Sequence, residues 1–369
     1  MEQLYFGFRD PAVIKALQRE IWKVAEKLDR PIKIMEICGG HTHTIVKYGL
    51  PQLLPPSIQF VHGPGCPVCV MPKERIEHAL VLARQPGVIL ATLGDMIRVP
   101  GATGSLAQVR SQGYDVRPLH STFQVLEIAR QNPDKKVIFF AIGFETTTPM
   151  TAALIERQLK EGVSNIYYHI NHVLVPPPMR VLMEDPRTKI DAFIAPSHVS
   201  VIIGAKSYRF LAEEFHTPVV VAGFEPVDVM EGVLMLVKQI VEGRAEVENQ
   251  YRRATSWEGN RKAQELIEKY MEVRPSFRWR GLGDIPNSAL QLRPEFRELD
   301  AEEIYREILP DQPIDDHKLC ICGDILKGLA SPLECKLFGK GCTPSNPVGS
   351  CMVSDEGACN AYYRYRRRR

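Results

Sequence analysis

The chain has 369 residues, of which 44% are hydrophobic and 24% are charged, and its formal net charge is +2. This composition is typical of a soluble globular protein with a sizeable core, and the small net charge gives no indication of nucleic-acid binding. The chain lacks an apolar signal segment and any run of about 18 uncharged apolar residues. We therefore expect a cytoplasmic protein without membrane contact, whose basic run at residues 362–369 is a solvated tail.

Short apolar runs alternate with helical patterns over most of the chain. A first helix is predicted from Pro11 to Leu28, with Asp10 as its N-cap. Further helices are predicted near residues 73–85, 121–132, 149–161, 205–215 and 227–243. The candidate strands are Ile32–Ile37, Ile58–Val61, Val88–Thr92, Val137–Ile142, Asn165–Ile170, Ile190–Ala195 and Val219–Ala222. This alternation favours an α/β fold with parallel sheets that are covered on both faces.

The turn Cys38–His43, with the sequence Cys-Gly-Gly-His-Thr-His, follows the apolar run Ile32–Ile37 and precedes a segment that can start a helix. In an open α/β sheet such a turn lies at the carboxyl edge, where ligands bind. Its two glycines allow the backbone to approach a ligand closely. The thiol of Cys38 and the imidazoles of His41 and His43 are suitable ligands for a transition metal, so we predict a functional site at this turn.

A second group of thiols, Cys66 and Cys69, follows the next predicted strand in the segment Gly-Pro-Gly-Cys-Pro-Val-Cys at residues 63–69. We expect this loop and the Cys38 loop to meet in one cleft. A Cys-x-x-Cys pair can bind a metal or cycle as a redox disulfide. With Cys38 and the neighbouring histidines, these thiols are too few for an iron–sulfur cluster but sufficient for one iron or zinc ion.

Polar residues also follow other predicted strands. The tripeptide Gly-Phe-Glu occurs twice directly after a buried strand and ends at Glu145 and at Glu225, which suggests two related α/β units or two equivalent strand ends. We predict a functional role for Glu145, although either glutamate can also simply favour a helix N-terminus. His172 and His198 lie at strand ends as well, where a functional and a structural role are both open.

The pattern changes after residue 245. Residues 258–272 are predicted to form one amphipathic helix, and residues 279–283 to be irregular. The following segment has few candidate strands and little core of its own, so a metal centre would supply the missing stability. It contains six of the nine cysteines, namely Cys320, Cys322, Cys335, Cys342, Cys351 and Cys359.

The spacing of these six cysteines favours an iron–sulfur cluster. Four thiolates bind a four-iron cluster, which leaves two cysteines over. Structural zinc favours Cys-x-x-Cys pairs, and the six form none; disulfides or free thiols are the remaining alternative. Because the chain has no phosphate loop, dinucleotide fingerprint or Gly-x-Ser-x-Gly elbow, hydride transfer and ordinary hydrolysis lack support.

The motifs at residues 35–43, 63–69 and 143–147 and the C-terminal cysteines resemble those of the HypD family of hydrogenase maturation proteins. The resemblance covers essentially the whole chain. It implies two similar α/β domains that face a cleft and a small, irregular or helical domain with a [4Fe–4S] cluster. The corresponding division is an N-terminal helix in residues 1–30, α/β domains at 31–133 and 134–245, and an iron–sulfur domain at 246–369.

The resemblance also implies roles for the cysteines. Cys38 would hold a mononuclear iron ion, together with a small chaperone of the HypC type, while cyanide and carbon monoxide ligands are attached. Cyanide would arrive as a thiocyanate on a HypE-type donor, and the finished iron unit would pass to the hydrogenase large subunit. The implied cluster ligands are Cys320, Cys335, Cys342 and Cys359, and the implied redox pair is Cys322 and Cys351.

We interpret the protein as a redox-active scaffold for metallocofactor assembly. The residues expected to act in the reaction are Cys38, His41, Cys66, Cys69 and Glu145. Two other interpretations stay open: an iron-carrying scaffold whose cluster is purely structural, and a cluster-dependent disulfide reductase. The second leaves Cys38 and its neighbouring histidines unexplained.

Overall fold

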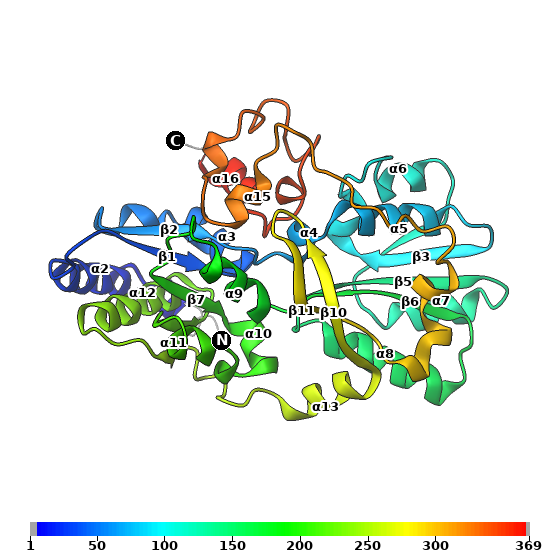
Figure 1. The fold of residues 1–369 in the computed structure, drawn as a ribbon, viewed down its shortest axis with the longest axis horizontal. Coiled ribbons are helices and arrows are strands. Elements are labelled where there is room, and N and C mark those ends of the chain that lie inside the picture. The colour runs from blue at the N-terminus through cyan, green and yellow to red at the C-terminus, as the bar shows by residue number, and fades with distance from the viewer. Residues whose placement is uncertain (1–5, 367–369) are drawn as a thin grey trace.

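The computed structural model describes residues 6–366, which form two parallel β-sheets, one antiparallel strand pair and a cysteine-rich C-terminal segment. Figure 1 shows the two sheets on the left and right of the molecule, with the C-terminal segment, in orange to red, above them. The antiparallel pair lies in the middle of the same view.

The first sheet has five parallel strands in the order β2-β1-β7-β8-β9. Its central strands are almost entirely apolar and buried, as expected for a parallel sheet that is covered on both faces. Helices α2 (Pro11–Ala25) and α12 (Pro226–Val241) pack together on it, and their apolar side chains share one core with the strands. The strands are β1 (Ile32–Glu36), β2 (Ile58–His62), β7 (Ala192–Pro196), β8 (Val219–Ala222) and β9 (Val247–Asn249).

The second sheet has four parallel strands in the order β4-β3-β5-β6. These strands are β3 (Val88–Leu93), β4 (Val116–Leu119), β5 (Lys136–Gly143) and β6 (Ile166–His172). The helices that connect them or precede them are α5 (Lys73–Ala83), α6 (Leu106–Ser111), α7 (Gln124–Gln131) and α8 (Thr148–Glu161). In both sheets all strands are parallel, so their carboxyl ends meet at one edge.

The antiparallel pair consists of β10 (Met271–Trp279) and β11 (Gly283–Leu292), with an irregularity between Arg274 and Ser276. It follows helix α13 (Arg261–Tyr270) and packs beside β6, where the Leu174 N–H donates to the Ser288 carbonyl at 2.9 Å. The remaining helical segments are short: α3 (Gly39–Lys47), η1 (Leu50–Gln52), α4 (Pro67–Val70), η2 (Gly94–Arg98), α9 (Pro176–Glu184), α10 (Ser197–Ile203), η3 (Ala205–Tyr208), α11 (Arg209–Glu213), η4 (Pro294–Leu299), α14 (Ala301–Ile304), α15 (Cys322–Leu326), η5 (Pro332–Glu334), η6 (Ser350–Met352) and α16 (Ala358–Arg366).

The predicted α/β class with parallel sheets is confirmed, and each predicted strand is present within two residues of its expected bounds. The predicted division of the chain into domains stays a prediction, and the sheets can be described against its boundaries. The boundary between residues 133 and 134 falls inside the second sheet, because β3 pairs with β5 across it. Residues 192–249 return to the first sheet, where β7 pairs with β1. Whether the parts fold as separate domains stays a prediction.

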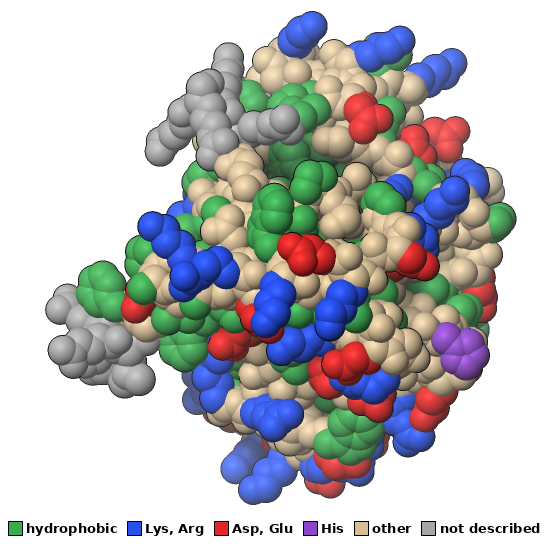
Figure 2. Space-filling model, turned by 90° about the vertical axis from the view of Figure 1, so that its left-hand side faces the viewer, with side chains coloured by type: hydrophobic (Ala, Val, Ile, Leu, Met, Phe, Trp, Pro, Cys, Tyr) green, Lys and Arg blue, Asp and Glu red, His purple; other side chains and the backbone are tan. Residues whose placement is uncertain are grey.

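No helix within residues 6–366 is long and apolar enough to cross a lipid bilayer. Figure 2 shows the left-hand side of Figure 1, on which Lys and Arg side chains are interspersed with Asp and Glu side chains. This mixture agrees with the small net charge of +2. The last three residues of the predicted basic tail, 367–369, lie outside the described residues.

Candidate functional site

Cys38 lies where β1 ends and α3 begins. It has an extended backbone, with φ −155° and ψ 130°, and is the N-cap residue of α3. Its side chain is only 2% exposed. Burial, and next the carboxyl group of Glu356, raise the pKa of the Cys38 thiol well above its usual value, although the backbone N–H groups of Gly40 and His41 lower it. The thiol is therefore protonated at neutral pH unless a cation takes the place of its proton.

The Cys38 and Cys66 loops lie side by side, as the sequence predicts. The Gly39 N–H donates to the Gly65 carbonyl at 2.9 Å. A Cβ at Gly65 would overlap the backbone of Cys38, and a Cβ at Gly39 would overlap Glu356. Gly65 therefore allows the two loops to approach each other closely. Gly39 allows the C-terminal segment, through Glu356, to pack directly on the Cys38 loop.

The histidine beside the Cys38 sulfur is His198, whose Nδ1 lies 3.7 Å from it. His41 instead donates from Nε2 to the carbonyls of Ala222 and Gly223, at 3.1 and 3.0 Å. The ring of Phe224 packs against both imidazoles, with centroid separations of 4.7 Å to His41 and 5.0 Å to His198. Burial lowers the pKa of each histidine to about 4, so both are neutral and available to bind or orient a ligand.

The other strand-end histidine, His172, is buried and hydrogen-bonded to the Thr151 hydroxyl at 2.8 Å. The two Gly-Phe-Glu motifs also differ. Glu225 forms an ion pair with Arg9, its Oε1 accepting from the guanidinium at 2.7 Å. Glu145 is buried, and its Oε1 accepts from the Val175 N–H at 2.9 Å.

Burial raises the pKa of Glu145 to about 7, and its Oε2 has no hydrogen-bond partner among the described residues. Burial raises the pKa of Tyr208, and the negative charges that Glu145 and Cys38 can carry raise it further.

A cleft with a volume of about 540 Å³ opens between strand ends of the two sheets. Gly143, Phe144, Thr146 and Thr147, at and after the end of β5, and His198, after β7, line it. Pro67 and Val68, from within the Cys66–Cys69 loop, and Ser354–Glu356 complete the lining. Glu356 is exposed to solvent in the cleft. Partial burial of its carboxyl group, and next the negative charges of Asp95 and Asp355, raise the pKa of this group.

Cys66 and Cys69 form a disulfide. The Ser350 hydroxyl donates to the Cys69 carbonyl at 3.0 Å, and the Cys69 sulfur lies 4.0 Å from the Ser350 carbonyl oxygen. The next residue, Cys351, is fully buried. The disulfide therefore borders the C-terminal cysteine segment, and Cys66, Cys69, Cys322 and Cys351 lie near one another.

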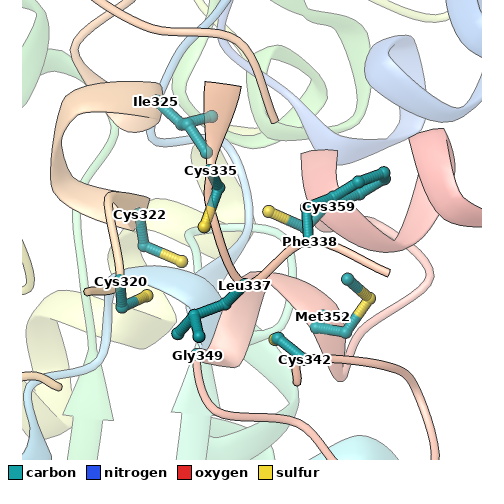
Figure 3. Close-up of a pocket in the computed structure, with 10 residues that line it drawn as sticks. All are labelled: Cys320, Cys322, Ile325, Cys335, Leu337, Phe338, Cys342, Gly349, Met352 and Cys359. Carbon is teal, nitrogen blue, oxygen red and sulfur yellow. The ribbon is translucent and has the colours of Figure 1, made fainter. Parts of the chain in front are cut away.

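Figure 3 shows a cavity in the C-terminal segment into which several thiols project. Its volume is about 10 Å³. The other side chains that line it are apolar, and a Cβ at Gly349 would meet the sulfurs of Cys320 and Cys322 at 2.8 Å. Cys351 does not line this cavity. The cysteines that do are Cys320, Cys322, Cys335, Cys342 and Cys359.

The chemistry of this cavity fits an iron–sulfur cluster. The hydrogen bond with Cys322 and burial raise the pKa of Cys320 and Cys359, and burial raises that of Cys342. An apolar cavity lined by thiols holds them as thiolates only beside metal cations. Within residues 6–366 no three Cys, His, Asp or Glu side chains already stand at metal-binding geometry, so a cluster would draw these thiolates together.

Comparison with known proteins identifies the family. The family model described as "HypD: Hydrogenase formation hypA family" matches residues 12–366. A hydrogenase expression/formation protein HupD from Azotobacter chroococcum mcd 1 is 51% identical over 98% of this chain and 96% of its own length. The chain belongs to the HypD family. Hydrogenase maturation factor HypD of Rhodobacter capsulatus is 48% identical over 97% of each chain, and that of Escherichia coli K12 is 46% identical over 96% of this chain and 94% of its own.

Membership of the HypD family confirms the resemblance inferred from the motifs, and the chain is a hydrogenase maturation factor of this family. Some residues of the site were not predicted. Glu36, Tyr208 and Glu356 adjoin the Cys38 loop or the cleft. Glu36 could have been found, because a carboxylate inside the apolar run of β1 signals a buried polar interaction. Nothing in the sequence around Tyr208 or Glu356 indicates that either residue belongs to the site.

Proposed function

We propose that this protein holds an iron ion at Cys38 while cyanide and carbon monoxide ligands are attached to it. The observation that carries this proposal is the position of Cys38. Its thiol lies at the carboxyl edge of the first sheet, beside the neutral His198 and the disulfide loop, and behind a cleft large enough for a partner's segment. The iron is the cargo of the reaction and is released when its ligand set is complete.

The residues around Cys38 suit this cargo. Burial and the neighbouring carboxyl groups disfavour a free thiolate, so an iron cation that takes the place of the proton gains a strong, soft ligand. His198 is positioned to be a second ligand or to accept the thiol proton. The cleft leaves room for a HypC-type chaperone, and the HypE-type cyanide donor would approach the same side.

The Cys66–Cys69 pair is suited to release cyanide from a thiocyanate. In the balanced reaction, R–SCN and the two thiols of Cys66 and Cys69 give R–SH, HCN and the Cys66–Cys69 disulfide. Cyanide then binds the iron and leaves a proton in the cleft. The disulfide present in this structure corresponds to the product of that step. Glu145, protonated below about pH 7, is placed to supply or accept a proton.

The C-terminal thiols would restore the pair. Cys322 and Cys351 lie near Cys66 and Cys69, so thiol–disulfide exchange can move the disulfide from the cleft into the C-terminal segment. A [4Fe–4S] cluster, when bound, supplies electrons one at a time. The residues that would hold it are Cys320, Cys335, Cys342 and Cys359.

Cys351 provides the sharpest test, because it does not line the cysteine cavity. In the Cys351→Ser variant we expect iron binding at Cys38 and the visible absorption of the cluster to be retained. Cyanide bound to iron, measured by its infrared stretching bands, should be lost. Cys322→Ser should give the same loss, with cluster content checked by iron and sulfide analysis.

Unchanged cyanide bands in the Cys351→Ser variant would refute the thiol relay and favour an iron-carrying scaffold with a structural cluster. Loss of the cluster in that variant would instead assign Cys351 to the cavity. Cys38→Ala is the matched control, because it should lose the iron itself while it keeps the cluster.

A further inference from the structure

A chain of buried and half-buried hydrogen bonds joins the C-terminal helix α16 to the Cys38 loop. The Tyr362 hydroxyl lies 3.1 Å from Nε2 of His62. Nδ1 of His62 lies 2.6 Å from Oε1 of Glu36, and Oε2 of Glu36 accepts from the Cys38 N–H at 3.0 Å. Four residues from three separate parts of the chain thus connect α16 with the backbone of Cys38.

The direction of these hydrogen bonds is defined by their chemistry. Oε1 of Glu36 also accepts from the Thr42 hydroxyl, so the carboxylate is surrounded by donors. We take His62 as neutral, so that Nδ1 donates to Glu36 and Nε2 accepts from the Tyr362 hydroxyl. This last hydrogen bond exists only when α16 is docked.

Helix α16 also carries a residue of the cysteine cavity. Cys359, in its first turn, lines the cavity three residues before Tyr362. Glu356, two residues before α16, packs on Gly39 so closely that no side chain fits there. One short segment therefore contributes both to the cysteine cavity and to the wall of the Cys38 loop.

We propose that Tyr362 and His62 are positioning residues that couple the folded cysteine cavity to iron holding at Cys38. When the cavity is assembled, α16 is held in place, and the Tyr362–His62–Glu36 chain fixes the Cys38 backbone in its extended, binding conformation. When the segment is displaced, Glu36 loses its support and the Cys38 loop loosens. This inference rests on the proposed iron-holding role of Cys38.

The test compares two tyrosines of the same helix. Tyr362→Phe removes the hydroxyl that supports His62. The matched control is Tyr365→Phe, because the Tyr365 hydroxyl lies 3.3 Å from His43 and is not part of the chain to Glu36. Binding of added ferrous iron at Cys38 is measured as the difference in bound iron between each tyrosine variant and the same variant that also carries Cys38→Ala. Hydrogen exchange is measured at the Cys38 amide.

We expect Tyr362→Phe to weaken iron binding about fivefold and to speed exchange of the Cys38 amide by a similar factor, with unchanged cluster absorption. Tyr365→Phe should change neither quantity. Equal effects of the two variants, or no effect of Tyr362→Phe on amide exchange, would overturn the proposal. If the unaltered protein binds no iron that depends on Cys38, the proposed function fails. The exchange rate of the Cys38 amide still decides whether the Tyr362–His62–Glu36 hydrogen bonds fix this loop.

Discussion

The Cys38 loop and the C-terminal cysteine cavity use the same side chain in two different structural settings. Cys38 is held by a parallel strand, by the first turn of a nine-residue helix and by backbone hydrogen bonds to the neighbouring loop. Of the cavity cysteines, Cys322 and Cys359 lie on helices of five and nine residues and the others lie outside helices, and half of the ten residues that line the cavity are cysteines.

This difference indicates how each site obtains its shape. The position of Cys38 follows from sheet pairing and packing, so we expect it to form without metal. The cavity lacks such a framework, so its shape depends on whatever binds the thiols. A preformed site suits a cargo that is loaded and released, whereas a site organised by its metal suits a cofactor that stays bound.

The largest expected effect concerns the cavity. Cys342→Ser should abolish cluster binding and open the C-terminal segment, at a cost of about 4 kcal/mol or more in local stability, while both sheets remain folded. Limited proteolysis within residues 320–366 and far-ultraviolet circular dichroism would measure the two effects. If circular dichroism shows the sheets unfolding together with the segment, the contrast between the two regions is not valid.

A second effect concerns the buried carboxyl group of Glu145. Because the pKa of Glu145 is raised from 4.5 to about 7, the folded state favours its protonated form. Its contribution to stability is complete below about pH 4.5 and is lost as the pH rises through about 7. The loss is up to about 3 kcal/mol for this shift. In Glu145→Gln, the decrease in the free energy of unfolding between pH 5 and pH 8 should be smaller by a comparable amount.

Denaturant titrations at the two pH values would provide this measurement. Glu225→Gln is the control, because Glu225 pairs with Arg9 near the surface, whereas Glu145 is buried. An identical pH dependence in Glu145→Gln and in the unaltered chain would show that Glu145 is not the titrating group.

The smallest effect tests the contact between the two regions. Gly39→Ala would place a Cβ against the Cβ and backbone of Glu356, and the segment must shift at a cost of about 2 kcal/mol. Gly94→Ala is a matched control, since a Cβ there meets open space. We expect only Gly39→Ala to raise the rate at which proteases cleave the C-terminal segment. Equal cleavage of both variants would mean that this contact does not hold the segment.

The sequence predicts local structure better than pairing. The apolar run of β1 predicts a strand, but nothing in it specifies β7, about 160 residues later, as its neighbour. The β10–β11 pair was not predicted, because Pro275 and Pro286 lie within it and prolines argue against a paired strand. An irregularity at Pro275 accommodates the missing N–H.

The site shows the same limit. Cys38 and the Cys66–Cys69 pair could be placed together, because consecutive parallel strands end at one edge. Spacing could not separate Cys322, which lines the cavity, from Cys351, which does not. It could not distinguish His198 beside the Cys38 sulfur from His172 beside Thr151 either, since both follow strand ends.

The most direct test of the central claim is metal and sulfide analysis of anaerobically purified protein, with its visible absorption spectrum. We predict about four irons and four sulfides per chain, with a broad band that bleaches on reduction, and further iron that is lost when Cys38 is replaced by Ala. Zinc with a featureless visible spectrum, and no iron that depends on Cys38, would contradict it.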